Sequence, residues 1–503
     1  MGTTSPAYTI LLAGISYVTS IRDIPAIALY LNAFCLAVVV FMAYLIAEEL
    51  TAGRLSSFLV SVLVACSSIN VYVSAMGFEG MLLTLAVLSS LYFARHGSMF
   101  AALLVASVAP LIRPEGILCA GIVWGRLIAS RQLRVAHLLV FLVLPCAWIV
   151  FAGMYFGSPI PHSITAKRFF PYVYQPYDGH GATILEHVIN TPYEFGTFLV
   201  DVAYPAIAGN QFKTSYEAPT VSILPTLAFA VAFLTLVWTF MKWRELGRGF
   251  VYYSLYPMMF AVFYAFVGKT CVWYLPSFYT LSIVVLTASS FRAVRHLLAS
   301  NKFGMISKMR TGMVKWVICL FVFLCFVGAN QYRFNDDAGS ASIDTQRFPD
   351  IRGAAPVLAC DPRGQFWEWM ELIRFYVYRQ AALFLNDYSQ VTTKTLINEV
   401  GVFGYYYKGT VIDSVGLCSP ESLQFYPPPA SELYDEAGKT FTRSNNIIPS
   451  KLVLAVEPDY IVSMDIYIVY LLKGSEWFKK RYSMTDKVFY IFKRPLFILK
   501  RNS

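Results

Sequence analysis

Long runs of apolar residues, separated by short loops that carry much of the charge, recur through the first two thirds of this chain. Hydrophobic residues make up 57% of the 503 residues and charged residues 14%, a balance typical of polytopic membrane proteins and not of soluble enzymes. An α-helix needs about 20 apolar residues to cross a hydrocarbon core of roughly 30 Å. The predicted spans are 24–47, 56–74, 80–93, 99–112, 116–128, 135–156, 221–241, 250–267, 272–291 and 313–329.

Basic residues concentrate in alternate loops, which the positive-inside rule assigns to the cytoplasm. On that side lie Arg54, Arg95, His96, Arg126, Arg131, Arg134, Lys242, Arg244, Arg248, Arg292, Arg295, Lys302, Lys308 and Arg310. The outer side receives the loops at 74–79, 113–115, 157–220 and 268–271 and everything after Asn330. We therefore interpret the net charge of +10 as topology and contact with anionic membrane lipids, not as nucleic-acid binding.

The start of the chain fits this alternation less easily. Segment 7–20 is apolar but covers only about 21 Å as a helix, so it is predicted to lie on the membrane surface. Met1 then falls outside, which is unusual for a membrane protein without a signal sequence. We expect either that a preceding helix is missing from this chain or that 7–20 spans poorly in its place.

After the transmembrane part, 1–330, the sequence becomes mixed and polar, and 331–503 is predicted to form an extracytoplasmic α+β domain. A helix is predicted at 367–384 and strands at 452–456, 460–464 and 488–492. Cys360 and Cys418 are the only cysteines of this domain, and a disulfide between them on an oxidising face is left open. The nine cysteines of the chain show no metal-site spacing.

A pair of opposite charges flanks Pro114 between two apolar runs, with Arg113 before the proline and Glu115 after it. A charge at the bilayer centre costs roughly 2.5–3.5 kcal/mol on insertion scales, so such groups usually face a cavity, a partner or a substrate. Arg113 is either part of such a site or an interfacial turn that reaches lipid phosphate. Glu79 can form a structural ion pair with Arg113 or orient a sugar, and Glu115 can cap the following helix.

Further candidates for substrate binding lie on the predicted outer side. His162 is either an ordinary loop histidine or a ligand, and Lys167 with Arg168 is either a phosphate site or a basic collar on lipid headgroups. The aromatic rings of Trp273 and Tyr274 suit either stacking on a sugar ring or the aromatic belt of the membrane interface.

Five short stretches follow one another through most of the chain. They are Gly2-Thr-Thr-Ser-Pro-Ala-Tyr-Thr-Ile-Leu-Leu, Met76-Gly-Phe-Glu79, Arg113-Pro-Glu-Gly116, Tyr155-Phe-Gly-Ser-Pro-Ile-Pro-His-Ser-Ile-Thr-Ala-Lys167, and Glu399-Val-Gly-Val-Phe-Gly-Tyr-Tyr-Tyr with Val411-Ile-Asp-Ser-Val-Gly-Leu417. In this order they resemble the landmarks of a bacterial family of integral-membrane GT-C glycosyltransferases, similar to the actinobacterial terminal arabinofuranosyltransferases.

The resemblance implies a GT-C-like, inverting transferase in the bacterial inner (plasma) membrane. It would move a sugar from a polyprenyl-phosphate donor to a glycan or lipid acceptor of the cell envelope, and a divalent cation is left open. Members usually carry an acidic pair in the first outer loop, ahead of the stretch at which this chain begins. That pair is expected upstream of Met1, which leaves the activity of this exact chain open. Asp23 and Glu79 are the candidate catalytic acids within it.

Two rival functions remain open. A transporter or flippase for lipid-linked saccharides would favour inverted repeats and paired broken helices, and the sequence shows no clear internal repeat. A catalytically inactive envelope scaffold that binds glycan would explain the missing acidic pair. A transferase, by contrast, needs a base near the acceptor hydroxyl and cations for the leaving phosphate, for which Arg113, His162, Lys167 and Arg168 are the candidates.

Overall fold

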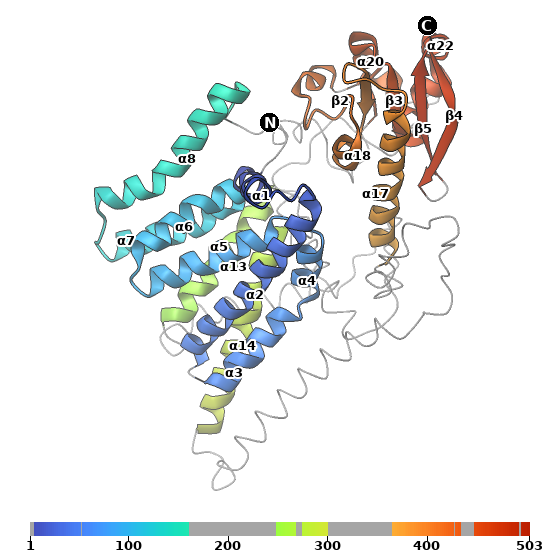
Figure 1. Cartoon of the computed structure of the whole chain (residues 1–503). Coiled ribbons are helices and arrows are strands. Elements are labelled where there is room, and N and C mark those ends of the chain that lie inside the picture. The colour runs from blue at the N-terminus through green and yellow to red at the C-terminus, as the bar shows by residue number, and fades with distance from the viewer. Residues whose placement is uncertain are drawn as a thin grey trace, which may run out of the picture. The chain divides into compact units, whose positions relative to one another are not determined.

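The computed structural model describes two compact units, one made of helices and one built on a sheet (Figure 1). The described residues are 5–51, 53–159, 248–267, 274–299, 365–426, 428–433, 447–491 and 494–502. The boundary predicted at residue 330 lies outside them, as do the predicted spans 221–241 and 313–329.

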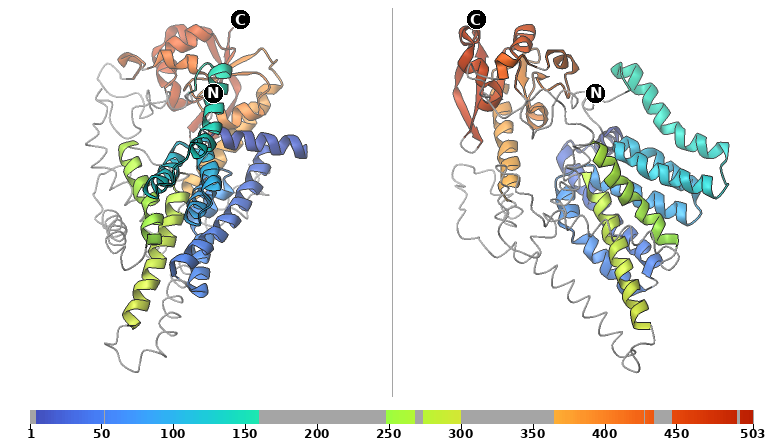
Figure 2. Two further views of the ribbon diagram at one scale, coloured as in Figure 1. Left: turned by 90° about the vertical axis from the view of Figure 1, so that its left-hand side faces the viewer. Right: turned by 180° about the vertical axis from the view of Figure 1, so that it is seen from behind.

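The first unit is a bundle of helices. In chain order its elements are α1 (Pro6–Thr19), α2 (Ile24–Thr51), α3 (Arg54–Ala65), α4 (Ser68–Ala75), α5 (Gly80–Arg95), α6 (Met99–Ile112), the 3-10 turn η1 (Pro114–Gly116), α7 (Ile117–Ala129), α8 (Val135–Phe156), α13 (Arg248–Val267) and α14 (Pro276–Ala299). Although α13 and α14 come late in the sequence, α14 packs against α2, α3 and α5, and α13 packs against α7 (Figure 2).

Two described helices, α2 with 28 residues and α8 with 22, are long and apolar enough to cross a membrane. The single span predicted at 56–74 is wrong in shape, because the chain bends by 55° between α3 and α4. Counted as one broken span, this pair raises the number to three. Two polar residues, Ser67 and Ser68, lie at the break between the two helices.

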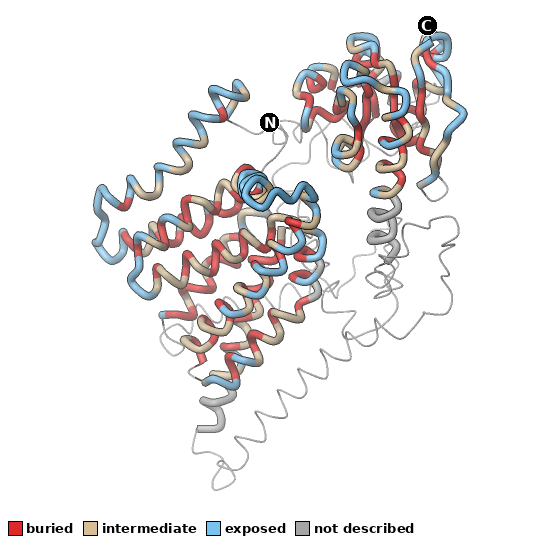
Figure 3. The backbone as a smooth tube through the Cα atoms, viewed as in Figure 1, coloured by how far each residue is buried: buried red, intermediate tan, exposed pale blue. Residues whose placement is uncertain are grey.

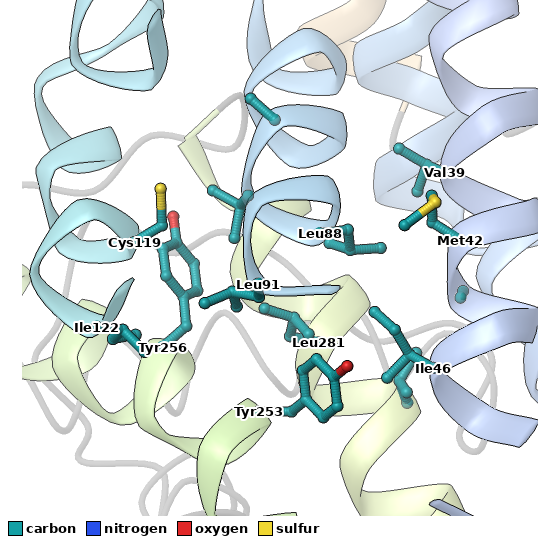
Figure 4. Close-up of a cluster of buried hydrophobic side chains, with 14 of the residues drawn as sticks. Val39, Met42, Ile46, Leu88, Leu91, Cys119, Ile122, Tyr253, Tyr256 and Leu281 are labelled. Carbon is teal, nitrogen blue, oxygen red and sulfur yellow. The ribbon is translucent and has the colours of Figure 1, made fainter. Parts of the chain in front are cut away.

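The shorter helices pack into the centre of the bundle and do not stand alone. Figure 4 shows their shared core, in which Leu88 and Leu91 of α5 lie between α2, α7 and the two late helices. Two large tyrosines of α13, Tyr253 and Tyr256, are fully buried in the same core. Helix α1 differs, because Tyr17 is 89% exposed and Val18 is 81% exposed, as a helix lying on a membrane surface would present them.

A sharp corner joins α6, η1 and α7, and Gly116 makes it possible. A Cβ atom at this position would overlap the carbonyl group of Ala109 and approach the nitrogen of Pro110 to 2.7 Å, so only glycine lets η1 lie against the backbone of α6. Arg113 enters the corner with extended backbone angles of −157° and 147°, as the steric demand of the following proline requires. The corner therefore ends α6 and aims the Arg113 side chain.

Gly116→Ala is expected to destabilise the bundle by about 3 kcal/mol, the upper end of the usual cost of overpacking, because the atoms in the way are backbone and cannot rotate aside. Thermal unfolding of the purified protein in detergent measures the change. Gly125→Ala is the matched control, since nothing lies within 4 Å of a Cβ at that helical position. Equal melting temperatures for the two variants would contradict the close approach at the corner.

The second unit is built on a five-stranded sheet. Its strands are β1 (Lys394–Ile397), β2 (Thr410–Asp413), β3 (Tyr460–Met464), β4 (Tyr482–Ile491) and β5 (Arg494–Arg501). Its helices are α17 (Gln365–Asn386), α18 (Val400–Tyr406), η5 (Pro420–Phe425), α19 (Ala430–Leu433), α20 (Ser450–Val456), α21 (Asp465–Gly474) and α22 (Glu476–Arg481). The helix predicted at 367–384 and the strand predicted at 460–464 are confirmed. The strand predicted at 488–492 is confirmed up to Ile491 as the end of the longer β4, and Phe492 lies outside the described residues.

The sheet has the order β2-β1-β3-β5-β4 and mixes two kinds of pairing. Strands β2, β1 and β3 are parallel, and β5 runs antiparallel to both β3 and β4. Helix α18 connects β1 to β2, so half of the domain has α/β character and the other half ends in an antiparallel pair. The predicted α+β class therefore describes the antiparallel pair β4–β5, whereas the parallel strands β2, β1 and β3 are arranged as in an α/β domain.

Helices cover both faces of this sheet. Successive residues of a strand point to opposite sides, so each central strand presents apolar side chains to both helical layers. Ile397 and Val462 pack with α17 and α18 on one face, whereas Leu396 and Ile461 pack with α20 on the other. Figure 3 shows the central strands buried between these layers.

The strand predicted at 452–456 is wrong, because these residues belong to α20. Leu452 and Val453 are adjacent and both buried against the sheet, which a strand with one solvated face would not allow. A short apolar run cannot be assigned to a helix or a strand by periodicity alone.

Candidate functional site

Polar side chains gather at two opposite ends of the helical bundle. Helices α5 and α7 both run from one end to the other. Glu79 and Glu115 lie just before them, whereas Arg95 and Arg126 lie in their last turns. The end that holds Glu79 and Glu115 also holds Arg113. This end is the candidate functional site.

Arg113 lies between two carboxylates. Its Nη1 pairs with Glu79 Oε1 and its Nε pairs with Glu115 Oε1. The Arg113 side chain is 6% exposed, that of Glu115 is 2% exposed, and that of Glu79 is 14% exposed. One cation and two anions give this triad a formal charge of −1, and Glu79 is its most accessible member.

An aromatic ring from a distant part of the chain covers the triad. The guanidinium carbon of Arg113 lies 3.9 Å from the ring centre of Tyr274, close enough for a cation–π interaction. Tyr274 comes just before α14, so the site joins the first and the later helices of the bundle. We call Glu79, Arg113, Glu115 and Tyr274 the Arg113 cluster.

A hydrogen-bonded chain holds the loop that carries Glu79. The Tyr8 hydroxyl donates to the carbonyl oxygen of Gly77 at 2.6 Å, and Asn32 Nδ2 donates to the Tyr8 hydroxyl at 2.7 Å. Gly77 has a φ of +70°, a conformation that favours glycine. Asn32 is fully buried, and its Oδ1 has no hydrogen-bond partner among the described residues.

Sequence reasoning did not single out Tyr8 or Asn32 as site residues. The available signal was Asn32 itself, an amide inside the apolar helix α2, because polar groups are rare at such positions unless they serve a purpose. Its partner could not be identified from the sequence, since the hydrogen bond joins residues on two helices.

One interpretation of the Arg113 region is wrong. Arg113 does not reach outward to lipid phosphate as an interfacial turn would, because its side chain is buried and paired. Glu115 lies in the turn just before α7 without a side-chain capping hydrogen bond at η1 or α7, and its favourable interaction with the N-terminus of α7 stays a prediction. The ion pair predicted between Glu79 and Arg113 is present.

Asp23, the other candidate acid, serves the start of α2. Its Oδ1 accepts a hydrogen bond from the backbone nitrogen of Ala26 at 3.1 Å, the geometry of a helix N-cap, and the residue is exposed. His162, Lys167, Arg168 and Trp273 lie outside the described residues. Where the chain is described, three or more His, Cys, Asp or Glu side chains nowhere gather as a metal site.

In the second unit, the acidic residues that end two strands are tied into the fold. Glu399 follows β1, pairs with Arg374 and accepts a hydrogen bond from the Tyr467 hydroxyl at 3.0 Å. Asp413 ends β2 and accepts hydrogen bonds from the backbone nitrogens of Val415 and Cys418. Burial raises the pKa of Asp413, which those two hydrogen bonds partly offset.

Comparisons with known proteins bear mainly on this second unit. A family model described as a domain of unknown function (DUF8728) matches residues 369–497, which include the whole described sheet apart from the end of β5. No curated protein matches the chain.

Proposed function

We propose that this protein is a polytopic GT-C-type glycosyltransferase of the bacterial plasma membrane. It transfers a sugar from a polyprenyl-phosphate donor to an envelope glycan or lipid on the outer face. The observation that carries the proposal is the Arg113 cluster, in which two buried charges and the partly buried Glu79 meet at the end of an apolar helix bundle. Charges placed among membrane helices are costly and usually mark substrate sites.

The geometry divides the roles within the cluster. Glu79 is its more exposed carboxylate, so it is the group that an acceptor hydroxyl can reach. In the transfer, the acceptor oxygen forms a bond to the anomeric carbon while the bond from that carbon to the phosphate oxygen breaks. The leaving phosphate takes the electron pair, and Glu79 takes the hydroxyl proton as general base. Arg113, held by Glu115, positions the Glu79 carboxylate.

The net negative charge of the triad argues against Arg113 as the main phosphate ligand. Its guanidinium already pairs with Glu79 and Glu115, so a phosphate would be a third anion beside one cation and would be repelled. We therefore assign neutralisation of the leaving phosphate to Lys167, the last residue of a stretch that resembles the GT-C family, and to Arg168, which follows it.

A second candidate function is an inactive envelope scaffold. The observation in its favour is that the charges of the Arg113 cluster satisfy one another, as they would in a joint that only fixes helix ends. In that case the membrane part anchors the second unit, which would bind glycan without transferring sugar.

One assay separates these functions. The full chain, reconstituted in vesicles, is supplied with a panel of polyprenyl-phosphate sugars and an extract of envelope acceptors. Transfer of label with release of polyprenyl phosphate supports the proposal. Saturable glycan binding without any release supports the scaffold, and label that crosses the bilayer without release supports a flippase.

The proposed topology makes its own prediction. A reporter fused after Asn330 is expected to report an extracytoplasmic location. The basic loops are assigned to the cytoplasm, and the segment after Asn330 lies on the opposite side of the predicted alternation. A reporter fused after Arg131, between α7 and α8, is the control and is expected to read as cytoplasmic. Swapped signals would overturn the assignment of sides.

A further inference from the structure

The end of the bundle opposite the Arg113 cluster holds a second set of charged residues. Arg95 Nε pairs with Glu49 Oε1 at 2.8 Å, and the Tyr253 hydroxyl donates to Glu49 Oε2 at 3.0 Å. His96 lies 3.5 Å from the same carboxylate. These contacts join the last turns of α2 and α5 to the start of α13, and they neutralise Glu49.

Arg126 and Tyr252 lie near the Arg95–Glu49 ion pair, and each has a hydrogen-bond donor that is not used within the described residues. Arg126 Nη2 donates to the carbonyl oxygen of Arg95 at 3.3 Å, and its guanidinium carbon lies 5.5 Å from the Tyr252 ring centre. Tyr252 is 8% exposed. Among the residues that the structure describes, neither Arg126 Nε nor the Tyr252 hydroxyl has a hydrogen-bond partner. Two adjacent donors without an acceptor are expensive to bury, so they point to a missing anion.

The net positive charge at this end of the bundle also favours binding of an anion. The described groups include the arginines Arg54, Arg95, Arg126, Arg248 and Arg292 against the acids Glu48 and Glu49. Five positive and two negative charges give an excess of three. Arg292 is fixed here as well, since its Nη1 donates to the Leu50 carbonyl at 3.4 Å.

We propose that the group formed by Arg95, Arg126 and Tyr252, near the ends of α5, α7 and α13, binds the phosphate of an anionic phospholipid. The ends of α2 and of its neighbours mark where the apolar helix surface stops, which is the depth of lipid headgroups. Basic pockets between membrane helices are suited to such headgroups. This site does not depend on the proposed transferase activity.

A purely local role for these arginines predicts something different. Arg95 and Arg126 lie in the last turns of their helices, where a cation also interacts favourably with the helix dipole. That role leaves the Tyr252 hydroxyl irrelevant and predicts no preference among lipid headgroups.

The test measures lipid binding to the full chain, purified in detergent and stripped of lipid, by native mass spectrometry and thermal shift. Phosphatidylglycerol is expected to bind about tenfold more tightly than phosphatidylcholine. Arg126→Gln should weaken phosphatidylglycerol binding about tenfold, and Tyr252→Phe about fivefold, through loss of one charged and one neutral hydrogen bond.

Arg134→Gln is the matched control, an exposed arginine in the loop between α7 and α8, and should leave binding within twofold of wild type. Equal affinity for the two lipids, or equal effects of Arg134→Gln and Arg126→Gln, would overturn the proposal. Inorganic phosphate that stabilises the protein as well as the lipid does would also overturn it, since the site would then be one for free anions. If Arg126→Gln fails to fold, Tyr252→Phe alone still decides, because that change removes only a hydroxyl.

Discussion

Arg113→Ala is expected to destabilise the helical unit by about 3–5 kcal/mol, because it leaves one buried and one partly buried carboxylate without their shared cation. The Glu115 side chain is 2% exposed and cannot turn to water, and that of Glu79 is 14% exposed. The effect should exceed that of losing a surface arginine, where an ion pair contributes only about 0–1 kcal/mol.

Thermal or denaturant unfolding in detergent measures this loss, with Arg134→Ala as the exposed control. A triple variant, Glu79→Gln with Arg113→Met and Glu115→Gln, removes all three charges at similar volume and is expected to recover most of the stability. Similar unfolding midpoints for Arg113→Ala and Arg134→Ala would mean that the triad is not buried as described.

Glu79→Gln is expected to lower sugar transfer by about 10²–10⁴-fold while the protein remains folded and inserted. The amide oxygen of Gln can still accept a hydrogen bond from Arg113, and Glu115 still balances the arginine charge. Only the capacity to take a proton is lost. The rate is measured in the vesicle assay with the donor that wild type accepts, and the melting temperature is recorded in parallel.

Asp23→Asn provides the matched carboxylate control, because Asp23 is exposed and caps α2. It should leave the rate within a few-fold of wild type. If Asp23→Asn abolishes transfer and Glu79→Gln does not, the general base is Asp23 and the assignment made here is wrong. The triple variant is useful again, since it should be stable yet inactive.

The charged residues of the Arg113 cluster could be predicted from the sequence, because apolar runs and single charges between them are local signals. Glu79 and Arg113 stand out as charges between apolar stretches, and the helices next to them, α5 and α6, begin and end within two residues of the predicted limits. The direction of each side chain was not available in the same way. Glu115 follows a proline, which suggests a cap, yet the glycine corner turns its carboxylate toward Arg113.

Contacts between distant segments could not be predicted from one sequence. The hydrogen bond between Tyr8 and Asn32 joins two helices, and the stacking of Tyr274 on Arg113 joins residues far apart in the chain. Nothing in the local pattern at either end specifies such a pair. The same limit explains residues 450–456, whose apolar run is compatible with a strand until the sheet beside it is known.

The origin of Tyr274 has a consequence for biogenesis. All three charges of the Arg113 cluster are made within the first 115 residues, whereas Tyr274 is made about 160 residues later. At a translation speed of about 5–20 residues per second, this delay is roughly 8–30 seconds. The triad can therefore form both of its ion pairs while the ribosome is still at work, and α5, α6 and α7 can leave the translocon with Arg113 already paired. The aromatic cover closes over an arginine that is already paired.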